Sequence, residues 1–92
     1  VVKAPNALQL VSDNNRLLKC YPVLSKNAIV VDLQGKIMTS VDLINFQGQS
    51  VLKVKPYQSV HNIDKDRLKK GLYIVCVKDN TDNQYIQKII VQ

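Results

Sequence analysis

Side chains able to do acid–base or nucleophilic chemistry are few in this 92-residue chain, and their spacing assembles no catalytic set. The one histidine, His61, has no Ser or Cys at a spacing that implies a nucleophile and its base. Asp64 and Asp66 lie close together, but a calcium site needs more oxygen ligands than two carboxylates provide. Three glycines are too few for a phosphate-binding loop. We therefore predict that the chain is not an enzyme and uses no metal or cofactor.

The charge balance is basic, with 13 Lys and Arg against seven Asp and Glu and a net charge of +6. Such a charge suits nucleic acid, anionic lipid or an acidic partner. The cations are scattered, however, and their densest group has acids between them and no aromatic residue: Lys65, Arg67, Lys69 and Lys70. A solvated surface is the simpler interpretation, and nucleic-acid binding is not expected.

Two cysteines, Cys20 and Cys76, lie 56 residues apart, which is compatible with the inter-sheet disulfide of an immunoglobulin domain. The features that accompany this disulfide are missing, because the chain has no Trp and Ile74 stands where a tyrosine corner would place its Tyr. No CxxC or Cys/His pairing indicates a metal site. Two free thiols, at least one of them buried, are therefore predicted.

Short runs rich in Val and Ile recur through the chain and are separated by turn residues, which is typical of a β-sandwich or barrel. No long segment holds the 3.6-residue period of a helix, and no apolar run approaches the roughly 18 residues of a membrane span. The pattern predicts one all-β domain with seven or eight mostly antiparallel strands. The predicted strands cover residues 7–12, 16–21, 28–33, 38–46, 51–55, 58–63, 72–77 and 84–91.

The predicted connections carry their own signals. A hairpin turn is expected at residues 47–48, because Gly48 can adopt the positive φ that such a turn requires. Residues 64–70 are expected to form a loop or a single helical turn that buries Leu68, and residues 78–83 a hairpin loop. Pro22 is expected to end the strand before it.

Four short motifs follow one another from about residue 18 to the last residue. The first is KCYP at residues 19–22, and the second is VDLINFQG at residues 41–48. The third, at residues 63–77, reads I-D-x-x-x-L-x-x-G-x-Y-x-V-x-V, and the fourth is KIIVQ at residues 88–92. In this order the motifs resemble those of the C-terminal sorting domain of the type IX secretion system (the type A form), which is found on exported proteins of Bacteroidetes-type bacteria.

The first two motifs depart from the family's pattern. Val23 and Leu24 stand where the family's Tyr-Pro-Asn-Pro element has its Asn and its second Pro. Ile44 and Asn45 replace a Tyr and an Asp of the second motif, whereas Gly48 keeps the position that the turn requires. The third and fourth motifs match without a gap.

The resemblance implies a seven- to eight-stranded antiparallel Ig-like β-sandwich at residues 16–92 that serves as an address label. Its expected partners are an outer-membrane shuttle β-barrel, the type IX translocon and a cell-surface sortase, together with an upstream cargo domain. The labelled protein is expected to pass through the periplasm and outer membrane and to be secreted or held at the cell surface. The sortase is expected to cut in the linker at residues 1–15, a region that includes the small or polar residues Ala4, Pro5, Asn6 and Ala7.

The last strand lies at a chain end and is predicted to be a sheet edge, whose free N–H and C=O groups a partner can capture by β-augmentation. The predicted recognition surface joins this strand to the two glycine turns and comprises Lys88, Ile89, Ile90, Val91, Gln92, Gly71, Tyr73 and Gly48. Tyr73 is also expected to share a core face with Val75 and Val77. A terminal strand that detaches would permit strand exchange and a homodimer.

The same alignment places Cys20 inward and Cys76 outward, which argues against a disulfide between them. A different function is compatible with the same fold. In that alternative the chain is an Ig- or fibronectin-like accessory or adhesion domain of a secreted protein. Such a domain would form a stable interface with its upstream neighbour, and export would not depend on its last residues.

Overall fold

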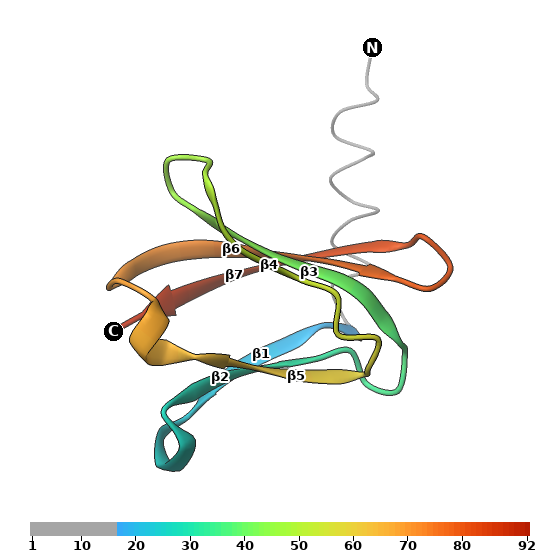
Figure 1. Cartoon of the computed structure of the whole chain (residues 1–92), viewed down its shortest axis with the longest axis horizontal. Coiled ribbons are helices and arrows are strands. Elements are labelled where there is room, and N and C mark those ends of the chain that lie inside the picture. The colour runs from blue at the N-terminus through green and yellow to red at the C-terminus, as the bar shows by residue number, and fades with distance from the viewer. Residues whose placement is uncertain (1–16) are drawn as a thin grey trace.

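The computed structural model describes residues 17–92, which form two antiparallel β-sheets packed face to face (Figure 1). The three-stranded sheet has the order β1-β2-β5 and consists of β1 (Lys19–Val23), β2 (Ala28–Asp32) and β5 (Val60–Asp64). The four-stranded sheet has the order β4-β3-β6-β7 and consists of β3 (Met38–Asn45), β4 (Ser50–Val54), β6 (Gly71–Asp79) and β7 (Gln84–Val91). The prediction of an antiparallel β-sandwich is confirmed.

Most strand boundaries fall within two residues of those predicted, and β7 agrees at both ends. Two details of the prediction are wrong. β1 continues through Pro22 to Val23, because β1 is a sheet edge, where a residue without an N–H is tolerated. β6 continues to Asp79, whose N–H donates to the carbonyl of Asn83 and extends the ladder to the turn. The linker at residues 1–15 and the strand predicted at residues 7–12 lie outside the described residues.

The core lies between the two sheets and is built from alternate residues of their strands, as the period-2 pattern predicts. The four-stranded sheet supplies Val41, Leu43, Tyr73, Val75, Val77, Tyr85 and Val91. Ile29, Val31 and Ile63 face them from the other sheet, and Met38 at the start of β3 completes the cluster together with Leu18 and Leu33. Each fully buried aliphatic side chain contributes roughly 1.5–3 kcal/mol relative to an exposed one, so this cluster is the main source of stability.

Two short 3-10 turns connect strands: one joins β1 to β2 within the smaller sheet, and the other leads from β5 to β6 of the larger sheet. The first, η2 (Leu24–Lys26), ends at Asn27, which has a φ of 48°, a left-handed conformation that Asn adopts more readily than most residues. The second, η3 (Lys65–Arg67), begins where the Asp64 side chain accepts a hydrogen bond of 2.9 Å from the N–H of Asp66. This turn confirms the one expected between residues 64 and 70, and Leu68 after it packs partly buried against the core.

The strand order places β4 in the sheet of β3, β6 and β7. In a constant-type immunoglobulin domain the fourth strand lies instead beside the fifth, in the other sheet. Here β3 and β4 form a hairpin, and β7 is left at the far edge of the same sheet. The edges formed by β1 and β7 meet on one side of the sandwich. This side is where the terminal motif, residues 88–92, lies.

Candidate functional site

β7 is an edge strand, as the sequence predicts, and within the described residues it pairs with β6. The bond from the N–H of Asp79 to the carbonyl of Asn83, 3.0 Å long, marks a hydrogen-bonded pair at the start of this ladder. Hydrogen-bonded and non-hydrogen-bonded pairs alternate along an antiparallel ladder. Counted from this pair, the N–H and C=O groups of Lys88 and Ile90 point away from β6, toward the free edge.

The side chains at the end of β7 divide between the core and the solvent. Val91 is buried and Ile89 packs partly buried against the core. Lys88 and Gln92 are exposed, and Ile90 is 68% exposed although it is a large apolar residue. In the predicted recognition segment, Ile89 and Val91 therefore pack against the core, whereas Lys88, Ile90 and Gln92 are accessible to a partner.

The register of β6 against β7 brings the third and fourth sequence motifs together. Gly71 is opposite Val91, and Tyr73 is opposite Ile89. The motifs are separated in the sequence by the β6–β7 hairpin, yet their residues are direct neighbours across the ladder. The pairing of β6 with β7 thus places Gly71 and Tyr73 beside the last strand, as predicted.

Tyr73 is 6% exposed, so its role in this region is structural. Its hydroxyl donates a hydrogen bond of 2.7 Å to the carbonyl of Lys69 and ties the loop before β6 to the sheet. A tyrosine hydroxyl bonded to the backbone a few residues upstream is the arrangement of a tyrosine corner. The sequence predicts no such corner, because Ile74 stands two residues before Cys76, whereas the structure forms it one residue earlier, at Tyr73.

Gly48 lies in the β3–β4 hairpin and not beside β7. Its φ is 86°, and its N–H donates to the carbonyl of Asn45 at 2.9 Å, as the hairpin prediction requires. The Asn45 side chain accepts from the N–H groups of Gln47 and Gln49, which fixes the turn. β4 and β7 are opposite edges of one sheet, so Gly48 is separated from the terminal strand.

The hairpin and the loop before β6 nevertheless line one open depression of about 400 Å³ at that end of the sheet. Gln47 and Gln49 border it from the hairpin, and Gly71 and Tyr73 from β6.

A groove of about 370 Å³ runs between the edges of β1 and β7. It is lined by Cys20, Tyr21, Pro22, Leu24, Ile29, Lys65, Lys88, Ile89, Ile90, Val91 and Gln92. All five residues of the terminal motif therefore line one surface, together with most of the first motif. Cys20 and Tyr21 were not assigned to the site from the sequence, since nothing local to residues 19–22 indicates which strand lies across from them.

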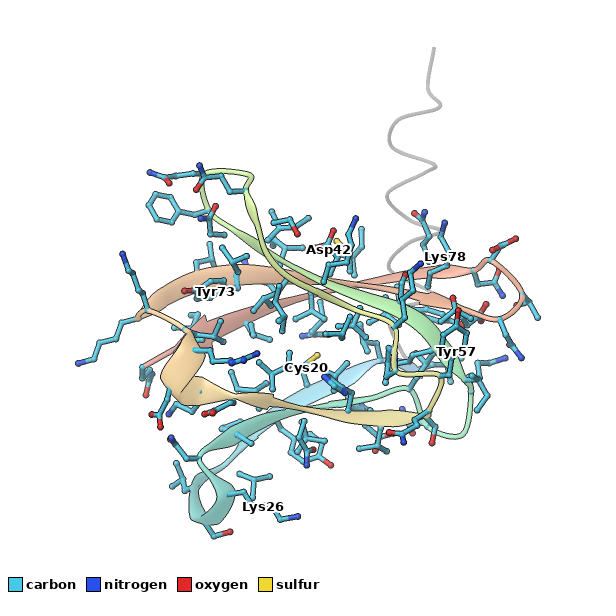
Figure 2. All side chains as sticks on the ribbon, in the orientation of Figure 1. Cys20, Lys26, Asp42, Tyr57, Tyr73 and Lys78 are labelled. Carbon is cyan, nitrogen blue, oxygen red and sulfur yellow. The ribbon has the colours of Figure 1, made fainter. Side chains whose placement is uncertain are left out.

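The two cysteines lie on different sides of the four-stranded sheet. Cys20 points from β1 into the space between the sheets (Figure 2), and burial raises the pKa of its thiol to about 12. Cys76 is on the outer face of β6, where burial and the charge of Asp42 raise its pKa. Both are free, and a sheet separates their side chains, so the prediction of two free thiols is confirmed. Both cysteines are half-buried, so the expectation that at least one of them is buried is wrong.

Asp79 is a buried polar residue, although the sequence predicts a hairpin loop at residues 78–83. Its carboxylate accepts hydrogen bonds from Thr81, Asn83 and Tyr85, within the hairpin that leads into β7. The D-x-T spacing is typical of an Asx turn and is the signal that indicates such a residue. Nothing local indicates that the carboxylate is buried.

Chemically active groups do not gather elsewhere in the described part of the chain. His61 on β5 has a pKa lowered by burial and lies apart from the groove. Among residues 17–92, no cluster of three or more His, Cys, Asp or Glu side chains could hold a metal ion. Within the same residues, no helix has the length and apolarity to cross a membrane.

Comparison with known proteins identifies a family and solved structures with a similar fold. Residues 19–92 match the family described as the secretion system C-terminal sorting domain. No curated protein matches the chain. The fold resembles part of PorZ from Porphyromonas gingivalis, described as an essential bacterial surface component of the type IX secretion system. The TM-score is 0.68 at 13% sequence identity, and the match covers 89% of this chain and 12% of PorZ. The family match spans all four motifs, and the chain therefore belongs to the C-terminal sorting domains of the type IX secretion system, which mark proteins for passage across the outer membrane to the cell surface or the extracellular space.

Proposed function

We propose that the secretion machinery reads this sorting domain at the free edge of β7, from Lys88 to Gln92. The observation that carries the proposal is the pairing of Gly71 with Val91 and of Tyr73 with Ile89, which joins the two best-matched motifs at one edge. The motif residues of β6 hold the strand in place, and the accessible Lys88 and Ile90 meet the partner. The outward-pointing N–H groups of Lys88 and Ile90 and the carbonyl of Ile90 suit capture by strand addition. The carbonyl of Lys88 accepts a hydrogen bond of 3.3 Å from the exposed side chain of Gln87, which a partner strand would replace.

Three partners follow from this role. An outer-membrane shuttle β-barrel and the type IX translocon bind the folded domain, and a cell-surface sortase acts on the chain as its substrate. The domain itself contributes no catalytic group. This view is supported by the position of His61 away from the groove and by the raised pKa of both thiols, since a thiol with a raised pKa is a poor nucleophile.

The test is an export assay with residues 1–92 fused to the C-terminus of a periplasmic fluorescent reporter, in a bacterium with a type IX system. Removal of residues 88–92 also removes the buried Val91, so this deletion is accompanied by point variants. Ile90→Pro removes one N–H from the free edge and leaves the β6–β7 ladder intact, whereas Ile90→Thr keeps that N–H.

We expect the deletion and Ile90→Pro to leave the reporter in the periplasm and Ile90→Thr to retain substantial export. Circular dichroism of each purified variant checks that it is folded. Normal export of folded Ile90→Pro would contradict recognition at this edge.

We also propose that the sortase cuts within residues 1–15, a region that includes Ala4, Pro5, Asn6 and Ala7. Leu18, 2% exposed, is the first core residue of the described sandwich, so a cut before residue 17 leaves that core complete. Mass spectrometry of the exported reporter gives its new C-terminus. A cut after residue 17 would contradict this assignment.

The same edge offers a route to a homodimer in which two copies exchange β7. Size-exclusion chromatography with light scattering, over a range of protein concentrations, tests this proposal. A monomer at every concentration would refute it.

A further inference from the structure

The charged side chains that line the groove between β1 and β7 are of one sign. Lys65 of η3 and Lys88 of β7 both line it, and none of the described residues that line it has a carboxylate side chain. The rest of its lining is mostly apolar, with Tyr21, Leu24 and Ile90 exposed to solvent at 43%, 82% and 68%. The exposed apolar residues and the two lysines therefore line one surface.

The groove also borders backbone that is available for pairing. The N–H and C=O groups of Lys88 and Ile90 point toward the free edge of β7. β1 forms the opposite wall and is itself the edge of the three-stranded sheet. An extended segment that pairs with β7 here would place alternate side chains toward the groove and toward solvent.

We propose that this groove binds an extended polypeptide segment of the secretion machinery in which apolar and acidic side chains are interspersed. The segment pairs with the backbone of β7, its apolar side chains cover Leu24 and Ile90, and its carboxylates meet Lys65 and Lys88. The inference rests on the proposed function and adds the chemistry of the partner. Opposite charges at an interface favour the right partner and speed association more than they add affinity.

The first experiment measures export of the reporter fusion with Lys65→Glu and Lys88→Glu combined, which is called the groove variant. The matched control is Lys36→Glu with Lys55→Glu, which makes the same change in net charge at two exposed lysines outside the groove. A double Lys→Arg variant at residues 65 and 88 keeps the charge. We expect the groove variant to lower the exported fraction at least tenfold, and the control and the arginine variant to stay within twofold of the unaltered domain.

Comparison with Ile90→Pro separates this inference from the proposed function. If Ile90→Pro blocks export and the folded groove variant does not, the edge is read but the partner is not acidic, and the inference is wrong. If neither variant affects export, the proposed function is wrong as well. If the groove variant blocks export and Ile90→Pro does not, the lysines meet an anionic partner that does not pair with β7, and both the inference of a paired strand and the proposed recognition at this edge are overturned.

A second experiment uses the purified 92-residue chain and two synthetic peptides, one that repeats Val-Val-Glu-Glu and one that repeats Val-Val-Lys-Lys, so that apolar and charged side chains alternate along each face of the added strand. We expect the Glu peptide to shift the backbone amide signals of Lys88 and Ile90 in NMR spectra, and to do so less at 0.5 M than at 0.05 M salt. Equal shifts with both peptides, or shifts confined to other strands, would overturn the inference.

Discussion

The Tyr85 hydroxyl on β7 donates a hydrogen bond of 2.8 Å to Oδ2 of Asp79, the last residue of β6. Asp79 is 1% exposed, and its other oxygen, Oδ1, accepts from the hydroxyl and N–H of Thr81 and from the N–H of Asn83. Burial by itself raises the pKa of Asp79, but these four hydrogen bonds outweigh it and lower the pKa to about 2. The ionised carboxylate thus joins the turn to β7, the strand that carries the proposed recognition edge.

Stability is expected to fall in acid because of Asp79. The folded pKa lies below the ordinary value of 3.8, so the ionised group stabilises the fold above pH 4, and this contribution is lost as the pH falls toward 2. A shift of this size corresponds to about 2 kcal/mol. Urea unfolding of the unaltered domain and of Asp79→Asn between pH 7 and pH 2 measures this contribution to the free energy of unfolding.

Asp79→Asn should be less stable at pH 7 and should lose much of this pH dependence. The matched control is Asp82→Asn, at an exposed position of the same turn, where we expect the unaltered pH profile. Equal pH profiles for Asp79→Asn and the unaltered domain would contradict the assignment.

Tyr73→Phe is expected to lower the free energy of unfolding by about 0.5–1.5 kcal/mol, the usual net value of one hydrogen bond. The substitution keeps the ring in the core and removes only the hydroxyl that holds the carbonyl of Lys69. Tyr57→Phe is the control, because Tyr57 is 62% exposed. Chemical denaturation of the unaltered domain and the two variants compares their free energies of unfolding. Equal stability of Tyr73→Phe and Tyr57→Phe would refute the role of this bond.

Leu43→Ala is expected to destabilise the domain by about 2–5 kcal/mol, since it removes a fully buried side chain from β3 and leaves a cavity. Leu24→Ala removes the same atoms from an exposed residue of the groove and should change the stability by less than about 0.5 kcal/mol. Thermal unfolding of both variants checks the difference. Similar losses at the two positions would contradict the assigned core.

The thiol of Cys20 is expected to react slowly in the folded domain, because its pKa of about 12 leaves little thiolate at pH 8. Alkylation with iodoacetamide, followed by mass spectrometry, should label Cys20 at least about tenfold more slowly in the folded than in the urea-unfolded chain. An oxidant should leave no bond between Cys20 and Cys76 in the native protein. A native intramolecular disulfide would show that the two thiols are not held apart.

The strands themselves are local features, and the sequence predicts them well. Alternation at Tyr73, Val75 and Val77 identifies a strand with one buried face because side chains on a strand alternate between its two faces. Turn residues such as Gly48 mark the ends of strands for an equally local reason, the positive φ that the turn needs. The edge position of β7 followed from its place at the end of the chain.

What the sequence alone determined about this protein is therefore its family, its all-β class and the buried face of each strand. Tertiary structure decided which strands meet: that β4 joins β3, that Gly71 stands opposite Val91, and that Cys20 faces the terminal motif across a groove. It also decided that Asp79 is buried and ionised. These outcomes depend on contacts between residues far apart in the chain, and a pattern with a period of two residues contains no information about which distant strand completes a sheet.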